Sequence, residues 1–348
     1  PEKIPSWREM EEIWYPKHLS LEQCSSEITA RYKARLSQGD SLTDLTGGFG
    51  IDCSFLATGF KSATYVERQE ELCEIAAHNF PILNLNHINV RNEDGVAYLQ
   101  TMSPVDCIFL DPARRNEHGG KTVSIADCEP NVAELEDLLL SKASRIMIKL
   151  SPMLDLSLAL KELKHTQEVH ILSVNNECKE LLILLGQTSP AEITIHCVNL
   201  FTKGTQEEQH FVFTREQEQR SQCTYTDSLG DYFYEPNASL LKAGAFRSIA
   251  AAYPIRKLHP NSHLYTSDTF IENFPGRIFR IVNQRSFNKK EVKENLADLK
   301  KANVTVRNFP ATVAELRKRL HLTEGGDTYL FASTLNNGQK VIIRCEKV

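Results

Sequence analysis

A glycine-rich stretch near the start of the chain has the composition of a nucleotide-binding turn. Residues 44–52 read DLTGGFGID, after a short apolar run and before a stretch with helical periodicity. Glycines at this position let the backbone approach a ligand closely, and the N-terminus of a following helix offers free N–H groups. The spacing is not G-x-G-x-x-G, because position 53 is Cys, so the stretch departs from the dinucleotide-binding fingerprint.

Acidic residues follow the next three apolar runs at strand-to-strand spacing. Glu67 ends the run 63–67, Asp94 follows the run 88–90, and Asp111 ends the run 107–111. The carboxyl ends of parallel strands meet at one edge of a sheet, where ligands of open α/β folds bind. A carboxylate after the second strand can accept both ribose hydroxyls, and one after the third can accept from an adenine amino group. Together with Asp44, these acids predict one nucleotide site.

Apolar runs alternate with helical stretches from residue 41 onward, which predicts an α/β fold with a doubly wound, Rossmann-like parallel sheet. The expected strands are 42–45, 63–66, 88–90, 107–110, 145–150 and 169–174, and the expected helices are 70–80, 96–102, 132–140 and 156–163. Strands at 193–200 and 210–214, joined by a polar hairpin, suit an antiparallel sheet edge.

The two ends of the chain have a different texture. Helices are expected at 7–15 and 20–36, the second beginning on a Ser-x-x-Gln pattern typical of a capping box. After the polar stretch 215–230, a small α+β pattern is expected: strands at 278–282, 304–309, 328–332 and 340–345, and helices at 290–302 and 312–320. The start at Pro1 rather than Met suggests that an N-terminal piece has been removed.

The glycine-rich stretch and the acid series resemble motifs I to IV of class I S-adenosylmethionine-dependent methyltransferases, over roughly residues 41–200. Residues 111–115 (DPARR) and 235–245 (EPNASLLKAGA) are further similar to a bacterial group with a C-terminal THUMP-like domain. The resemblance implies S-adenosylmethionine as cofactor, with Glu67 at its ribose and Asp94 at its adenine. The residues implied at the methionine end are Asp44, Thr46, Gly47, Gly48 and Gly50.

The expected acceptor side begins at Asp111-Pro112, where amino-methylating enzymes carry D-P-P-Y. Here the fourth residue is Arg114, whose guanidinium can stack on a base or contact a phosphate. D-P-A-R is also similar to uridine C5 methyltransferases, which use a Cys nucleophile after the fifth strand. Leu150 stands at that place, so the covalent route is not expected. Asp111, Pro112 and Arg114 are the predicted catalytic residues.

Further polar residues are candidates for holding the acceptor. Lys149 and Ser151 flank Leu150 at the end of the fifth expected strand, and either can equally be an ordinary strand end. Arg115 and Lys121 lie in a glycine-containing loop that could hold a polyanion or simply be solvated.

Charge is unevenly distributed along the chain. The net charge is −5, but residues 241–348 carry 19 Lys+Arg and 9 Asp+Glu, a net of +10, and the remainder carries −15. A basic C-terminal part suits a polyanionic partner, and aromatic residues are interleaved with its cations. The predicted partner is structured RNA. Attraction between the two halves would also explain the asymmetry.

Other classes of protein fit the sequence less well. Nine scattered Cys without a C-x-x-C pair are typical of a reducing cytoplasm rather than of disulfides, and no metal site is predicted. No apolar run is long enough to span a membrane. The oligomeric state is left open.

The expected domains are therefore an N-terminal helical segment (1–40), an S-adenosylmethionine-binding domain (41–214) and a basic THUMP-like α+β domain (215–348). The predicted function is methyl transfer to a nucleic acid. The alternatives are an RNA-binding protein with a decayed nucleotide fold, a methyltransferase for a small molecule or a protein, and an NAD-dependent oxidoreductase, which the absent third glycine disfavours.

Overall fold

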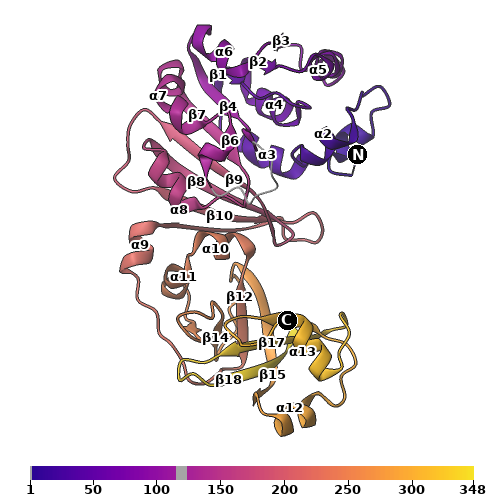
Figure 1. The fold of residues 1–348 in the computed structure, drawn as a ribbon, viewed down its shortest axis with the longest axis vertical. Helices are drawn as coiled ribbons and strands as arrows, with labels where there is room; N and C mark the ends of the chain where they lie inside the picture. The colour runs from indigo at the N-terminus through magenta and orange to yellow at the C-terminus, as the bar shows by residue number, and fades with distance from the viewer. Residues whose placement is uncertain (1, 115–123) are drawn as a thin grey trace. The chain divides into compact units, whose positions relative to one another are not determined.

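The computed structural model describes residues 2–114 and 124–348, drawn in colour in Figure 1. Two compact units can be distinguished, residues 1–208 and 209–348. The domain boundaries expected at 40/41 and 214/215 stay predictions. In the described ranges no helix has the length and apolar character needed to cross a membrane.

A nine-stranded sheet carries the first unit, with strand order β11-β10-β8-β9-β7-β4-β1-β2-β3. Strands β3, β2, β1, β4 and β7 pair in parallel, as the α/β pattern predicts. The strands are β1 (Gly39–Asp44), β2 (Phe60–Glu67), β3 (Ile88–Asn92), β4 (Val105–Leu110), β7 (Ala143–Leu150), β8 (Thr166–Val174), β9 (Glu177–Gly186), β10 (Thr194–Leu200) and β11 (Glu208–Thr214).

Strand β9 is the main element that the sequence pattern did not predict. It runs antiparallel between β7 and β8. The chain reverses into it at Asn175 and Asn176, whose φ angles of 49° and 65° are left-handed, as a tight hairpin requires. An asparagine pair tolerates that conformation, so the turn had a recognisable signal.

Helices cover the sheet where the sequence predicts them: α4 (Ile51–Leu56), α5 (Glu70–Ile82), α6 (Gly95–Thr101), α7 (Val132–Lys142) and α8 (Leu156–Glu162). Figure 1 shows α4 and α5 to the right of the sheet and α7 and α8 to its left, as in a doubly wound fold. The chain order reverses between the neighbouring strands β1 and β4, which is the switch point where such folds bind ligands.

The N-terminal segment is less helical than expected. It forms α1 (Pro5–Arg8), α2 (His18–Gln23) and α3 (Glu27–Arg35). The helix expected at 7–15 is wrong beyond Arg8, where the chain forms turns up to Glu12 and then irregular backbone bound by a distant side chain. The Trp14 N–H donates to Asn79 Oδ1 (2.9 Å), and Asn79 Nδ2 donates back to the Trp14 carbonyl (2.9 Å). The helix expected at 20–36 is interrupted between Gln23 and Glu27.

The second unit contains a seven-stranded sheet of order β13-β14-β12-β15-β18-β17-β16. Its strands are β12 (Tyr232–Pro236), β13 (Arg256–Lys257), β14 (Tyr265–Ser267), β15 (Gly276–Ser286), β16 (Asn303–Val306), β17 (Thr328–Thr334) and β18 (Lys340–Lys347), and its helices are α9 (Arg215–Arg220), α10 (Ala238–Ala243), α11 (Phe246–Ala252), α12 (Lys289–Leu296) and α13 (Val313–Leu320). The helix expected at 290–302 ends six residues early, at Leu296.

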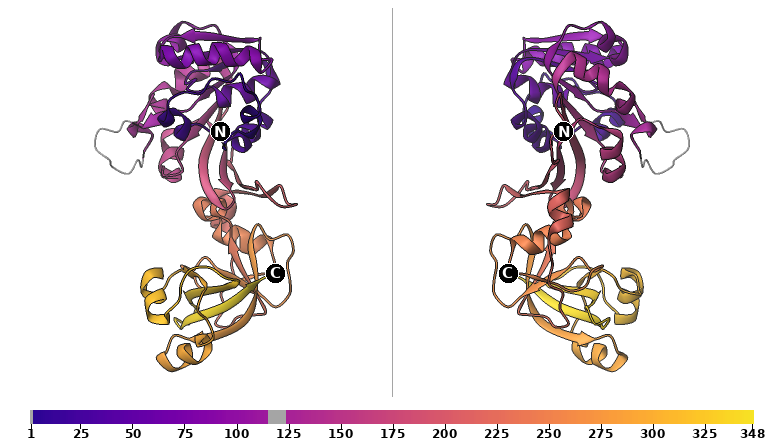
Figure 2. Two further views of the ribbon diagram at one scale, coloured as in Figure 1. Left: turned by 90° about the vertical axis from the view of Figure 1, so that its right-hand side faces the viewer. Right: turned by 90° about the vertical axis from the view of Figure 1, so that its left-hand side faces the viewer.

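Helices α12 and α13 pack on one side of this sheet, as the yellow and orange elements of Figure 2 show. Leu296 and Leu316 share a buried cluster with Leu330 and Ile342. A second cluster, which includes Phe233, Phe279 and Phe331, fills the other side. The unit therefore has its own hydrophobic core.

Candidate active site

A cavity of about 300 Å³ opens at the carboxyl ends of β1, β2 and β4. It gathers the predicted residues of the glycine-rich stretch and the acid series. Those that line it are Asp44, Thr46, Gly47, Gly48, Gly50, Glu67, Asp94 and Asp111. Other segments complete the wall: Ser20, Gln23, Cys24 and Ser25 of the N-terminal segment, Arg68 after β2, and Glu129 and Pro130 at the end of β6 (Cys128–Glu129).

The glycine loop between β1 and α4 is packed against the ring of Tyr65. A Cβ on Gly47 would lie 2.4 Å from the Cε2 atom of that ring, so only glycine fits. The Tyr65 hydroxyl donates to the Gly48 carbonyl, and the Gly47 N–H donates to the Val66 carbonyl (2.9 Å). Gly48 and Gly50 have φ angles of 56° and 85°, a conformation that favours glycine. The loop is held rigidly beside β2.

Glu67 is held by backbone amides at the end of β2. Its Oε2 atom accepts from the Gly48 N–H (2.9 Å) and its Oε1 atom from the Gln69 N–H (2.9 Å), and the residue is 8% exposed. Each carboxylate oxygen has a second lone pair for a ligand hydroxyl. The carboxylate is therefore fixed in place at the cavity wall before any ligand binds.

Asp44 and Asp111 are linked through Thr46. The Thr46 N–H donates to Asp44 Oδ1 (2.9 Å), and the Thr46 hydroxyl accepts from the Asp111 N–H (2.7 Å). Asp44 is 1% exposed, and burial raises its pKa to about 8. A cationic group placed against it would favour its ionised form.

Asp94 has a structural role that the sequence reading did not assign. Its Oδ1 atom accepts from the N–H groups of Val96 and Ala97 (3.0 Å each), so it caps the N-terminus of α6. The next residue must be small, because a Cβ on Gly95 would lie 2.2 Å from the Leu45 carbonyl oxygen. The cap holds the first turn of α6 in place beside the cavity.

The predicted acceptor-side residues Asp111 and Lys149 form an ion pair. Lys149 Nζ lies 2.7 Å from Asp111 Oδ2 and 3.7 Å from Asp52 Oδ2. Burial is the largest influence on both groups: it raises the pKa of Asp111, and it is outweighed at Lys149, whose pKa the neighbouring carboxylates raise. Lys149 therefore stays protonated at neutral pH.

This pair continues into a buried network that the sequence did not reveal. Lys33 of α3 is fully buried, with Nζ 2.8 Å from Asp52 Oδ1 and 2.6 Å from Glu180 Oε2. The Ser25 hydroxyl donates to Asp52 Oδ2 (2.7 Å). Although burial acts to raise the pKa of Asp52, the two lysines hold it below its usual range. Asp52 is the last residue of the glycine-rich stretch 44–52. Nothing in the sequence marked Lys33, a single Lys on a helix, as part of a buried network.

The other predicted acceptor residues are not found in the wall of the described cavity. Pro112 is buried, and neither Pro112, Lys149 nor Ser151 lines the described cavity. Arg114 belongs to the short strand β5 (Ala113–Arg114), where it pairs with Cys128. Arg115 and Lys121 lie outside the described residues.

Cys24 is a second position at which to look for the Cys nucleophile of the covalent C5 methylation route. The expectation against that route depended on sequence neighbours of Leu150, yet Cys24 lines the cavity from the N-terminal segment. Burial raises the pKa of its thiol, and its Sγ atom donates to the Leu21 carbonyl (3.1 Å). A neutral, donating thiol is a poor nucleophile, so the chemistry still disfavours attack by this residue.

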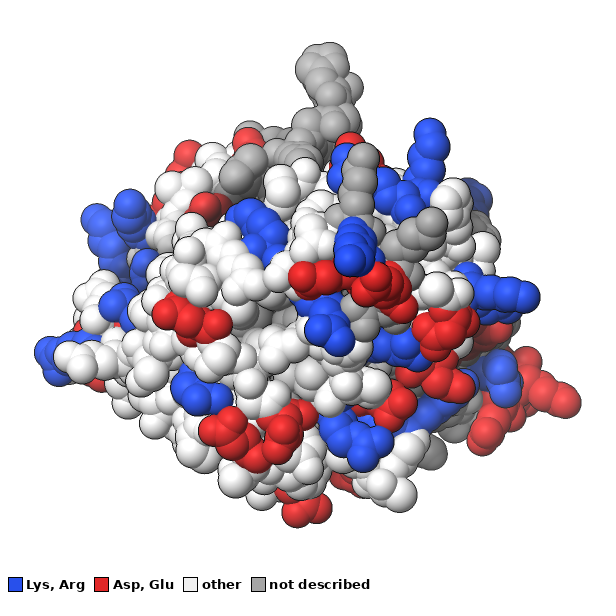
Figure 3. Space-filling view, turned by 90° about the horizontal axis from the view of Figure 1, so that it is seen from below, with Lys and Arg blue, Asp and Glu red and all other residues white. Residues whose placement is uncertain are grey.

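The cations of the second unit are extensively paired. Buried Glu235 is bound by Arg277 (2.6 Å) and Arg307 (3.5 Å). Other pairs join Arg256 to Asp268, Arg280 to Glu346, Arg317 to Glu324, and Arg344 to Asp298. Figure 3 shows one face of the molecule on which Lys and Arg are interspersed with Asp and Glu rather than gathered in one patch.

The sheet order, the switch-point cavity and the glycine loop define a class I methyltransferase fold. Comparison with known proteins agrees. A protein of Porphyromonas gingivalis W83 described as a "putative methyltransferase" is 38% identical, covers 99% of this chain and 86% of its own, and has a TM-score of 0.90. The chain belongs to the same family: class I S-adenosylmethionine-dependent methyltransferases with a C-terminal THUMP-like domain.

The domain comparisons concern the second unit. Residues 232–275 match a ferredoxin-like domain and residues 276–347 a THUMP domain-like family. A methyltransferase structure from Streptococcus mutans in complex with SAH (13% identity, 46% of this chain and 96% of that one) and an rRNA methylase structure from Streptococcus thermophilus (14%, 46% and 93%) have TM-scores of only 0.33, too low to bear on function. No curated protein matches significantly.

Proposed function

We propose that this protein transfers a methyl group from S-adenosylmethionine to structured RNA, with the C-terminal unit as the docking module. The observation that carries the proposal is the convergence of the glycine loop, Glu67, Asp94 and Asp111 on one cavity at the switch point of the sheet. Nine free cysteines suit a reducing, cytoplasmic setting.

The cavity residues suit this cofactor in charge and in donor set. Among the described residues, Asp44, Asp52, Glu67, Asp94, Asp111 and Glu129 line the wall and Arg68 is the one basic lining residue, so the wall favours a cationic ligand. Asp44 and the glycine loop would hold the methionine end, Glu67 the ribose hydroxyls and Asp94 the adenine amino group. When bound, S-adenosylmethionine supplies an electrophilic methyl group on a sulfonium.

Asp111 is the proposed acceptor-side residue. Lys149 donates to its Oδ2 atom and favours its ionised form against burial, while the residue still reaches the cavity wall. A fixed carboxylate there can accept a hydrogen bond from an amine on the acceptor base and hold it in line for transfer. Arg114, next along the chain, would stack on the base or contact a phosphate.

Support for an RNA acceptor comes from the second unit. It matches a THUMP domain-like family and carries most of the basic excess of the chain. Several of its arginines are paired, so RNA contact would depend on the surplus of charge and on exposed rings such as Phe270, which is 45% exposed; Tyr265, in contrast, is fully buried. Binding through phosphates should weaken steeply with salt.

The test is mass spectrometry of nucleosides from RNA incubated with the protein and methyl-labelled S-adenosylmethionine. We expect one labelled methylnucleoside with the intact protein, formed on the order of a hundredfold more slowly with Asp111→Asn. Cofactor binding by calorimetry without any labelled RNA would favour a small-molecule or protein acceptor. Failure to bind the cofactor at all would favour an RNA-binding protein with a decayed fold.

A further inference from the structure

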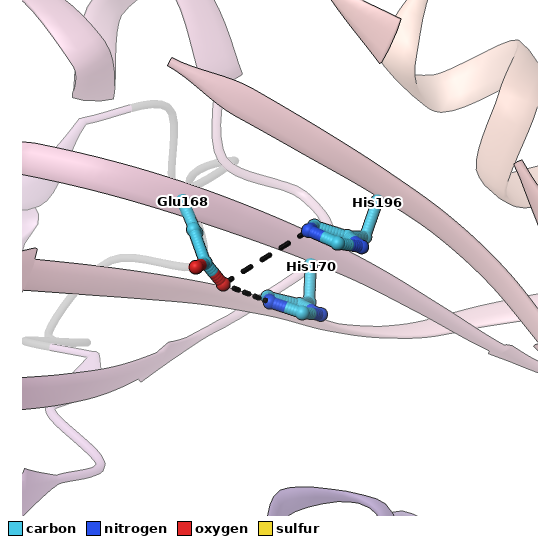
Figure 4. Close-up of side chains that lie close together, drawn as sticks. All are labelled: Glu168, His170 and His196. Carbon is cyan, nitrogen blue, oxygen red and sulfur yellow. Dashed lines mark hydrogen bonds and ion pairs between the residues drawn. The ribbon is translucent and has the colours of Figure 1, made fainter. Parts of the chain in front are cut away.

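Two histidines and a glutamate gather on one face of the sheet outside the cavity. Glu168 and His170 lie on β8, and His196 lies on the parallel neighbour β10, in register with His170. Residues two apart on a strand share a face, which brings all three side chains together. Figure 4 shows the carboxylate of Glu168 directed at both imidazole rings.

The three groups present ligand atoms at close range. Glu168 Oε2 lies 3.0 Å from His170 Nε2 and 3.9 Å from His196 Nε2, and one ligand atom from each residue lies within 4.8 Å of the others. Ligands at about 2.1 Å from a tetrahedral zinc ion are roughly 3.4 Å apart. The separations bracket that value, and two imidazoles with one carboxylate form a donor set that zinc accepts.

Tyr32 of α3 supplies the outer contact that such a site needs. Its hydroxyl lies 2.7 Å from His170 Nδ1, and both side chains are buried. Metal-binding histidines usually engage their second ring nitrogen in this way, which sets the tautomer. With the proton on Nδ1 and donated to the Tyr32 oxygen, Nε2 of His170 would have a lone pair for an ion bound beside Glu168.

The three residues differ in hydrogen bonding and in exposure. Without an ion, His170 Nε2 lies within hydrogen-bonding distance of Glu168 Oε2 (3.0 Å), so a bound ion would take the place of the proton between them. The His170 and His196 rings stack in parallel, with centroids 4.1 Å apart and planes at 4°. An ion cannot lie in two parallel planes, so the less buried His196 ring must turn when it binds.

We propose that Glu168, His170 and His196 bind a zinc-like divalent ion as a structural site. The ion would tie β8 to β10 and, through Tyr32, to α3. None of these four residues lines the methyl-donor cavity. The site is therefore independent of the proposed methyl transfer, and its solvent side is open because Glu168 and His196 are partly exposed.

The experiment uses the full chain, treated with a chelator, dialysed and titrated with Zn²⁺, and separately with Co²⁺ for its visible absorption. We expect one ion per chain, with tetrahedral Co²⁺ bands. His196→Ala should remove the bands and lower affinity at least tenfold, and Tyr32→Phe should lower it about 10–100-fold. The matched control is His165→Ala, which breaks a lone histidine–carboxylate pair with Glu136 (3.2 Å) and should change nothing.

Two results would overturn the proposal. One is the absence of a stoichiometric ion in the wild-type chain. The other is equal binding by wild type and His196→Ala, which would assign the ion to cysteine thiols elsewhere. Circular dichroism of each variant distinguishes loss of a metal ligand from loss of the fold. Unchanged ion binding by His165→Ala shows that the titration is sound.

Discussion

The proposed donor and acceptor sides of the cavity are held in different ways. On the donor side, backbone N–H groups fix the carboxylates of Glu67 and Asp94, and every contact comes from residues close by in one βα unit or its neighbour. On the acceptor side, Asp111 is fixed by Lys149, and Lys149 shares Asp52 with the buried Lys33.

This difference has a physical consequence. Hydrogen bonds from backbone amides depend on local chain conformation and tolerate changes elsewhere. A buried ion network depends on every charge being present, because one lost partner leaves an uncompensated charge out of water. We therefore expect the acceptor side to be the more fragile of the two, and substitutions on each side should separate them.

The largest effect should come from Lys33→Met. The substitution leaves Asp52 and Glu180 buried without their shared cation, and it should reduce the free energy of unfolding by about 3–5 kcal/mol. Denaturant titration measures this. Lys17→Met breaks the ion pair between Lys17, which is 83% exposed, and Glu71. This variant should lose no more than about 1 kcal/mol of the free energy of unfolding. Equal losses in the two variants would show that the network does not hold the acceptor side.

Asp111→Asn should come next and should affect catalysis. The amide keeps the size of the side chain but loses the charge that positions the acceptor amine, so turnover should fall on the order of a hundredfold. Cofactor affinity should change little, since Asp111 stands beyond the donor contacts. Methyl transfer with labelled cofactor and calorimetry give the two values, and undiminished turnover would remove Asp111 from the acceptor side.

Glu67→Gln tests the donor side. An amide cannot accept at both ends, so the N–H of Gly48 or Gln69 loses its partner and the ribose contact is weakened. We expect a loss of about 1–3 kcal/mol in cofactor binding. Glu70→Gln, at an exposed neighbouring position, is the matched control. Calorimetric affinities that coincide for the two variants would contradict the second-strand assignment.

Asp94 allows its two roles to be separated. Asp94→Ala removes the cap of α6 and should cost about 1 kcal/mol of stability. Asp94→Ser restores a capping oxygen without a carboxylate, so it should recover stability while cofactor affinity stays low. Thermal unfolding and calorimetry on both variants test this. Recovery of affinity along with stability would mean that Asp94 acts only through the helix.

The smallest effect concerns pH. Burial raises the folded-state pKa of Asp44 to about 8, above its unfolded value of 3.8, so the folded protein holds a proton that the unfolded chain releases. Its contribution to stability is therefore lost as pH rises from about 4 to about 8. Asp44→Asn keeps the acceptor for Thr46 and removes the titration. Stability of the variant should fall less between pH 6 and 8, and identical slopes would contradict the buried carboxyl.

The donor side could be read from sequence because its signals are local. A glycine turn and an acid after each of three successive strands are visible in short stretches of sequence, and the seven residues predicted from them line the cavity. The acceptor side could not, because Lys33, Asp52 and Glu180 come from α3, α4 and β9 and meet only in the folded chain. The same holds for the N-terminal wall at Gln23 and Cys24.

The fold shows a similar division. Apolar runs of strand length predicted β1 to β4, β7 and β8, and the helices between them. The helix expected at 7–15 failed because Asn79, far along the chain, binds the Trp14 backbone. The residue pattern of an isolated segment does not contain such a partner. Strand β9 was not predicted, although the Asn175-Asn176 pair is typical of the turn that precedes it.

The pairing of Lys33 with Glu180 also sets an order of events during synthesis. The two residues are 147 positions apart. At translation rates of about 5–20 residues per second, Glu180 leaves the ribosome roughly 7–30 s after Lys33. Until β9 arrives, Lys33 of α3 has Asp52 but lacks Glu180, so the N-terminal wall of the cavity is less stable before the sheet is complete. The full buried network beside the cavity therefore forms only after the nascent chain has made its central sheet.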